Sequence, residues 1–136
     1  MPKPAVRSPA RVLVVDDDAR TARLLARMLG EDGYDVELAL DGAAAVGRLA
    51  RLPTPDILVT DMKMPHVDGA GVARYARWRR PGLPVFLVTG HPELVSDLAR
   101  TFDPPALVFT KPLDYTALVD ALARATDGAP AANATR

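Results

Sequence analysis

The stretch VLVVDDD at residues 12–18 gives the clearest information about the fold. Four consecutive apolar residues are typical of a strand that is covered on both faces of a parallel sheet, and the run stops at three aspartates. A segment with helical periodicity follows from about Ala19 to Asp32, and Gly33 is its expected C-terminal stop. The inner side of this helix is expected to carry four apolar residues, Leu24, Leu25, Met28 and Leu29.

The same order of strand and helix recurs along the rest of the chain. Strands are expected at about 12–15, 35–40, 57–60, 85–88 and 106–110, and helices at about 19–32, 42–52, 69–80, 92–102 and 114–125. This alternation indicates βαβ units and a five-stranded parallel sheet with helices on both faces. The second strand alternates polar and apolar residues, which predicts a place at an edge of the sheet.

Length and composition predict one domain. The 136 residues are close to the commonest domain size, and we assign residues 10–125 to the domain and 1–9 and 126–136 to tails. Seventeen basic and 17 acidic residues leave no net charge to attract nucleic acid or a membrane surface. The absence of cysteine excludes disulfides and thiolate metal sites. With no apolar run long enough for a membrane span and no signal-peptide pattern, a cytoplasmic location is expected.

Polar side chains cluster at the C-terminal ends of the predicted strands. Asp16 and Asp17 follow the first strand, Asp61 the third, Thr89 the fourth and Lys111 the fifth. A right-handed doubly wound sheet places these four strands side by side, and ligands of such sheets bind at this edge. We therefore expect three carboxylates, a hydroxyl and an ammonium to converge at one site.

The chemistry of this set points to a metal ion and a phosphoryl group. Three neighbouring carboxylates repel one another unless a cation compensates, and an all-oxygen site suits Mg²⁺, with Mn²⁺ as a second option. With its charge neutralised by the metal and Lys111, one carboxylate can attack phosphorus and form an acyl phosphate.

Four segments carry a resemblance to a known family. VLVVDDD at 12–18, DMKMPHVDG at 61–69, VTG at 88–90 and KP at 111–112 resemble the receiver domain of bacterial two-component response regulators, over about residues 10–125. The resemblance implies a flavodoxin-like (βα)5 sandwich of three layers, with strand order 2-1-3-4-5.

The resemblance also implies roles for individual residues. Asp61 is the expected phosphoacceptor, and Asp17, Asp61 and the backbone carbonyl of Lys63 are expected to bind Mg²⁺, with Asp16 assisting through metal-bound water. The hydroxyl of Thr89 and the ammonium of Lys111 are expected to contact oxygens of the phosphoryl group.

Two further features of the site follow from the same resemblance. Gly90 is expected to leave the acceptor open to a donor, and the Lys111-Pro112 peptide bond is expected to be cis.

The partners implied by the resemblance are proteins. The phosphoryl donor is a phosphohistidine on a sensor histidine kinase or a histidine phosphotransferase, and phosphorylation changes the binding of a downstream partner. No nucleic acid, no membrane and no turnover of a separate substrate are expected. The domain is expected to be a monomer or a weak dimer through the fourth helix, fifth strand and fifth helix, either as a stand-alone receiver or as part of a longer regulator.

Several positions depart from the family pattern. The aromatic residue expected three positions before the lysine is replaced by Val108, with Phe109 one step later, which puts coupling through an aromatic side chain in doubt. Lys63 and His91, two residues after the acceptor and the threonine, occupy positions that influence the lifetime of the acyl phosphate in the family. We hypothesise that they set the hydrolysis rate here.

Other interpretations of the same residues stay open. The aspartates after the first strand can cap a helix. The run of arginines and aromatics at 74–80 can form a nucleic-acid surface, although the solvated side of the third helix is the preferred interpretation. A Mg²⁺-dependent phosphohydrolase of the haloacid-dehalogenase type also uses an aspartate nucleophile, but it normally has a cap. A flavin-binding flavodoxin would have a phosphate-binding loop where this chain has an acidic one.

Overall fold

The computed structural model describes residues 9–126. Five strands alternate with five helices. In chain order they are β1 (Arg11–Val15), α1 (Ala19–Glu31), β2 (Asp35–Ala39), α2 (Gly42–Leu49), β3 (Ile57–Asp61), α3 (Gly69–Arg79), β4 (Val85–Thr89), α4 (Pro92–Arg100), β5 (Leu107–Thr110) and α5 (Tyr115–Thr126). The predicted elements are all present, and their ends differ from the predicted ones by at most three residues. The predicted tails lie almost wholly outside the described residues.

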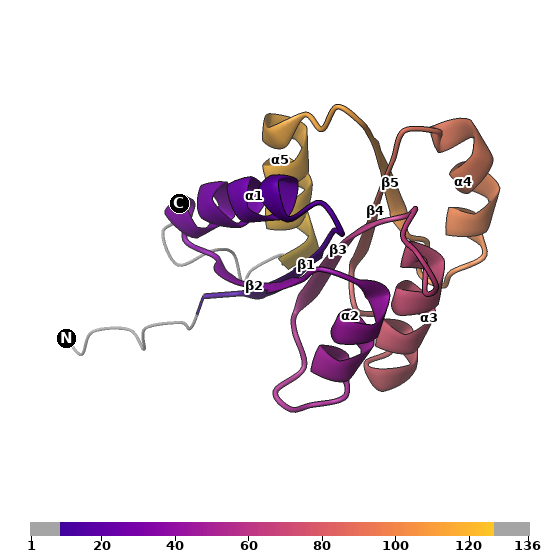
Figure 1. Cartoon of the computed structure of the whole chain (residues 1–136), viewed down its shortest axis with the longest axis horizontal. Helices are drawn as coiled ribbons and strands as arrows, with labels where there is room; N and C mark the ends of the chain where they lie inside the picture. The colour runs from indigo at the N-terminus through magenta and orange to yellow at the C-terminus, as the bar shows by residue number, and fades with distance from the viewer. Residues whose placement is uncertain (1–8, 127–136) are drawn as a thin grey trace.

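The five strands form one parallel sheet in the order β2-β1-β3-β4-β5. Helices α1 and α5 cover one face, and α2, α3 and α4 cover the other, so the domain has three layers (Figure 1). This confirms the predicted sandwich, its strand order and the edge position of β2. Because all strands run the same way, their C-terminal ends meet at one edge.

The sheet separates two apolar cores. Leu13, Leu58 and Leu87 point toward α2, α3 and α4, while Val14, Val59 and Phe86 point toward α1 and α5. The alternation of side chains along each strand produces this division. On the α1/α5 side, Leu118 and Leu122 of α5 are fully buried.

A hydrogen bond outside the core also joins α1 to α5. The hydroxyl of Tyr115 donates to Asp32 Oδ2 at the end of α1, over 2.5 Å. Gly33 follows with φ 97°, a left-handed conformation that ends the helix as predicted. These contacts position α1 relative to α5 on their shared face of the sheet.

Two expectations about helices were wrong. Leu24 was predicted on the inner side of α1, but 49% of its surface is exposed, because the buried stripe runs through Ala22, Leu25 and Leu29. Helix α2 was predicted to reach Leu52, but it ends at Leu49, and Leu52 is 80% exposed in the following loop. Apolar periodicity in the sequence did not distinguish these exposed leucines from core residues.

The arginines at the end of α3 mostly hold neighbouring loops. Arg77 donates to the carbonyl of Leu83, and Arg79 donates to the carbonyls of Leu49 and Ala50. Arg80 forms an ion pair with Asp56 at 3.0 Å. Three of the four arginines at 74–80 therefore have a structural role.

Within residues 9–126, the longest helices are too short and too polar to cross a bilayer.

Candidate functional site

The turn after β1 presents two carboxylates toward the sheet edge and uses a third for local structure. Asp18 caps α1 by accepting hydrogen bonds from the backbone N–H groups of Arg20 and Thr21. Asp16 is buried and accepts a hydrogen bond from the N–H of Asp18 at 2.9 Å, whereas Asp17 is exposed. The helix cap is therefore Asp18, and Asp16 and Asp17 are left for another role.

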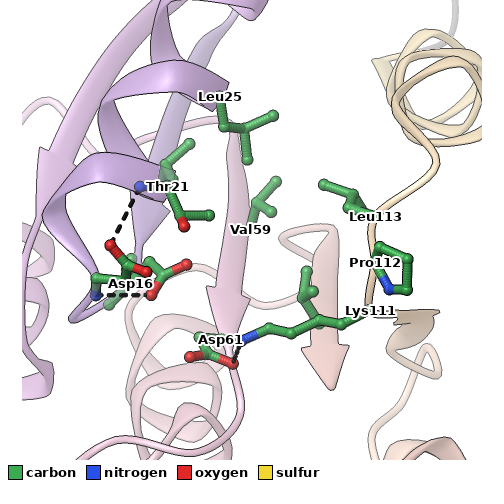
Figure 2. Close-up of a pocket in the computed structure, with 12 residues that line it drawn as sticks. Asp16, Thr21, Leu25, Val59, Asp61, Lys111, Pro112 and Leu113 are labelled. Atoms are coloured by element: carbon green, nitrogen blue, oxygen red, sulfur yellow. Dashed lines mark hydrogen bonds and ion pairs between the residues drawn. The ribbon is translucent and has the colours of Figure 1, made fainter. Parts of the chain in front are cut away.

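Asp61 lies at the C-terminal end of β3 beside a lysine from β5. Only 6% of its surface is exposed, and its Oδ1 lies 3.0 Å from Nζ of Lys111 (Figure 2). The backbone holds this arrangement, since the N–H of Lys111 donates to the carbonyl of Thr89 at 2.9 Å. The Lys111-Pro112 bond is cis, as predicted. Two residues far apart in the sequence thus form one ion pair at the sheet edge.

Thr89 ends β4 at the same edge. The pairing of β3 with β4 sets Asp61 opposite Val88, so Thr89 lies one position further along. Its side chain is buried, and its Oγ1 accepts a hydrogen bond from the N–H of His91 at 2.9 Å. Because that bond uses the oxygen as acceptor, the hydroxyl proton can still be donated to another group.

Two further carboxylates, those of Asp16 and Asp17, lie close to Asp61 of this ion pair. One oxygen from each of Asp16, Asp17 and Asp61 lies within 4.8 Å of the others. Burial raises the pKa of Asp16 above its ordinary value, and the charge of Asp61 raises it further, although the hydrogen bond from Asp18 acts in the opposite direction. A divalent cation would relieve this repulsion, and the all-oxygen donor set fits Mg²⁺ or Mn²⁺.

Lys111 supplies the nearest positive charge to these carboxylates. Partial burial lowers the pKa of Lys111, but the hydrogen bond to Asp61 and the charge of that carboxylate outweigh it, so the pKa lies above its ordinary value. The side chain is therefore a permanent cation near neutral pH, available to a phosphoryl oxygen once Asp61 is modified.

Lys63 lies two residues after Asp61 in the loop that connects β3 to α3, with an exposed side chain. Its backbone carbonyl as a metal ligand stays a prediction. His66 and His91 are also exposed.

Gly69, at the start of α3, allows that loop to pack closely on Asp61. A Cβ at this position would lie 2.3 Å from the carbonyl oxygen of Asp61 and 2.9 Å from Cα of Met62. The N–H of Gly69 also donates to the carbonyl of Met62 at 2.9 Å. This role of Gly69 was not predicted from the sequence, although the Asp68-Gly69 pair at the start of the helix was an available signal.

We expect Gly69→Ala to displace the backbone of Asp61, because the atoms that the new methyl group meets are not on flexible side chains. A displacement of the Asp61 nucleophile by about 1 Å can reduce the rate of phosphoryl transfer by about 100-fold. Forcing the extra methyl group into this close contact is expected to lower the free energy of unfolding by about 1–3 kcal/mol. Phosphorylation kinetics and urea denaturation measure the two effects. Gly30→Ala on α1 is the control, since no atom lies within 4 Å of its added Cβ; equal behaviour of the two variants would contradict the prediction.

The structure also places the residues that depart from the family pattern. Val108 packs against the core on the α2, α3 and α4 side, whereas Phe109 points to the α1/α5 side. There its ring centroid lies 5.8 Å from that of Phe86. Because side chains of a strand alternate between faces, Phe109 does not replace the aromatic residue that the family has at position 108.

The comparisons with known proteins agree with this geometry. The family model described as the response regulator receiver domain matches residues 12–123. The transcriptional regulatory protein GlrR of Escherichia coli (strain K12) is 32% identical over 114 residues, which cover 84% of this chain and 26% of that protein. The response regulator MprA of Mycobacterium tuberculosis (strain ATCC 25177 / H37Ra) is 44% identical over 79 residues, covering 58% of this chain and 34% of that protein.

A solved structure gives the same result. A response regulator receiver domain protein from Clostridium thermocellum superposes with a TM-score of 0.78 at 26% identity, covering 88% of this chain and 95% of that one. The chain spans only about a quarter to a third of the length of the curated relatives named above. The match to the family model nevertheless extends over nearly all described residues, and the chain therefore belongs to the response regulator receiver domain family.

Proposed function

We propose that this chain accepts a phosphoryl group on Asp61 in a Mg²⁺-dependent reaction, and that phosphorylation changes the binding of a protein partner. The observation that carries this proposal is the buried Asp61 carboxylate, 3.0 Å from the Lys111 ammonium and within 4.8 Å of the carboxylate oxygens of Asp16 and Asp17. Receiver domains of this family bind Mg²⁺ at an acidic pocket and act as signalling switches.

The chemical step uses the nucleophilic oxygen of Asp61. An oxygen of Asp61 forms a bond to phosphorus while the bond from phosphorus to the donor atom breaks, and the leaving group takes the electron pair. Lys111 then pairs with a phosphoryl oxygen, and Thr89 can donate its hydroxyl proton to another. Asp17, Asp61 and the backbone carbonyl of Lys63 would hold Mg²⁺, with Asp16 assisting through metal-bound water, and the ion would supply positive charge to compensate the phosphoryl oxygens.

The proposed donor is a phosphohistidine on a sensor histidine kinase or a histidine phosphotransferase. The family assignment supports this, since two relatives are named as a transcriptional regulatory protein and a response regulator. The downstream partner is a protein. The exposed side of α4, β5 and α5 stays the predicted surface for that partner or for weak dimerisation. The domain is proposed to catalyse only its own phosphorylation and dephosphorylation, in the cytoplasm and without binding nucleic acid or membrane.

The proposal is tested by incubating the protein with a small phosphodonor, with and without Mg²⁺, followed by intact-mass spectrometry. A single phosphoryl adduct that requires Mg²⁺ is the expected result. Continuous release of phosphate from a phosphoester would instead support the aspartate-nucleophile hydrolase.

Removal of one metal ligand should weaken Mg²⁺ binding. We expect Asp17→Asn to raise the Kd for Mg²⁺ by about tenfold or more, because the charge of the ligands sets the affinity of such sites. Isothermal titration measures this. Asp18→Asn is the matched control: it removes the same charge from the same turn, and asparagine still caps α1. Equal losses in the two variants would show a long-range charge effect in place of coordination.

The residues at positions 63 and 91 are proposed to tune the lifetime of the acyl phosphate. Both side chains are exposed, two residues after Asp61 and Thr89, and an exposed charge interaction of about 0.3–1 kcal/mol changes a rate by about two- to fivefold. We therefore expect Lys63→Asn and His91→Glu to change the decay rate by this amount, measured from the loss of the adduct with time. An unchanged decay rate in both would count against the role.

A further inference from the structure

A cavity of about 400 Å³ lies directly beside Asp61. Its walls are mainly apolar and come from α1, the central strands and the connection between β5 and α5. The side chains that form the apolar part are Val14, Leu25, Val59, Val88, Pro112 and Leu113. Figure 2 shows Leu25 and Val59 on one side of this space and Leu113 with Pro112 on the other.

The polar end of the cavity is the reactive site itself. Asp16, Asp61 and Lys111 line the same space as Leu25 and Leu113. A single small molecule can therefore reach the Asp61 carboxylate with one end while the other end lies among apolar side chains. The volume falls in the range of small-molecule sites, which are mostly apolar with a few polar groups.

The apolar walls of the cavity are partly exposed to solvent. Leu25 and Leu113 are only partly buried, although both pack against the α1/α5 core. Thr21, one turn before Leu25 on α1, is a small residue at the rim of the cavity. A hydrocarbon group placed here would remove apolar surface from water, which is favourable in proportion to the area.

We propose that this cavity binds the apolar part of the leaving group of a small phosphodonor, and that the domain prefers acyl phosphates with short hydrocarbon chains. The inference rests on the proposed phosphorylation of Asp61. In the reaction, the bond between phosphorus and the acyl oxygen breaks, a bond between phosphorus and an oxygen of Asp61 forms, and the carboxylate leaves with the electron pair. No oxidant or reductant is required.

The charges at the site favour a hydrocarbon tail over a charged one. Three aspartates, Asp16, Asp18 and Asp61, line the cavity together with one cation, Lys111. An additional anionic tail would be repelled by these carboxylates, and any charged tail would lose its hydration against Leu25, Val59 and Leu113. The phosphoryl end of the donor carries the charge that the metal site and Lys111 can compensate.

The test compares acetyl, butanoyl and hexanoyl phosphate as donors. These molecules have closely similar leaving-group acidity and differ in methylene groups, so a difference in rate reports binding of the chain. Each buried methylene is worth about fourfold in binding, so two are expected to raise the second-order rate constant of Asp61 phosphorylation about fifteenfold. Intact-mass spectrometry at several donor concentrations with saturating Mg²⁺ measures the rates.

Two adjacent leucines provide a matched pair of variants. Leu25→Trp fills part of the cavity, whereas Leu24→Trp places the same side chain on the exposed side of α1. The ratio of butanoyl to acetyl rates should fall toward one in Leu25→Trp and stay at the wild-type value in Leu24→Trp. Leu113→Trp fills the cavity from the opposite wall and gives a second test if Leu25→Trp folds poorly.

The outcomes separate this inference from the function on which it rests. A ratio near one in the wild-type protein, or a high ratio that survives both cavity-filling variants, overturns the leaving-group site while Asp61 phosphorylation stands. Phosphoramidate, which has no acyl group, reports phosphorylation independently of the cavity. If neither phosphoramidate nor any acyl phosphate modifies Asp61, the proposed function fails and this inference fails with it.

Discussion

Asp61→Asn is expected to abolish phosphorylation by every donor. Asparagine has the same shape as aspartate, but its neutral amide is a poor nucleophile toward phosphorus, so no acyl phosphate can form. We expect no neighbouring carboxylate to replace Asp61 efficiently as the nucleophile, because the Lys111 ammonium lies beside Asp61, at 3.0 Å. Intact-mass spectrometry after incubation with a small phosphodonor and Mg²⁺ should show one adduct in the wild-type protein and none in the variant.

The matched control for this experiment is Asp120→Asn. Asp120 is an exposed aspartate on α5, so the substitution makes the same chemical change outside the site. Its adduct should form at the wild-type rate. An adduct that persists in Asp61→Asn, localised by peptide mapping to Asp16 or Asp17, would reassign the nucleophile within the same carboxylate cluster.

Phe86→Ala is expected to cause the largest loss of stability. Phe86 is a fully buried residue of β4 whose side chain points to the α1/α5 layer. Its ring packs against that of Phe109. Removing such a ring from a core costs about 3–5 kcal/mol of unfolding free energy. Because domains are stable by roughly 5–15 kcal/mol, this is a large part of the total. The midpoint and slope of urea denaturation measure the change.

A smaller truncation at the same position tests the cause of this loss. Phe86→Leu keeps most of the buried hydrocarbon and should lose less than half as much stability as Phe86→Ala. Equal losses in the two variants would indicate that contact with Phe109, and not cavity formation, sets the energy. At low temperature, where the folded state of Phe86→Ala still dominates, Asp61 should accept phosphate, since Phe86 does not line the site.

The sequence by itself determined the arrangement of elements and the chemical groups at the site. Uninterrupted apolar runs predicted strands buried on both faces, and β1, β3 and β4 have that burial. The positions of Asp16, Asp17, Asp61, Thr89 and Lys111 at strand ends followed from the same pattern. These predictions succeeded because local periodicity and the rules of parallel sheets fix which strand ends meet.

Only the tertiary structure decided how those groups and their neighbours fit together. The Lys111–Asp61 distance, the close approach at Gly69 and the cavity between Leu25 and Leu113 depend on how α1 and the β5–α5 connection pack against the sheet. The exposure of Leu24 depends on the rotation of α1 about its axis. Periodicity identifies apolar residues within a segment, but contacts between distant segments arise from the packing of all layers at once, which the sequence of each segment does not contain.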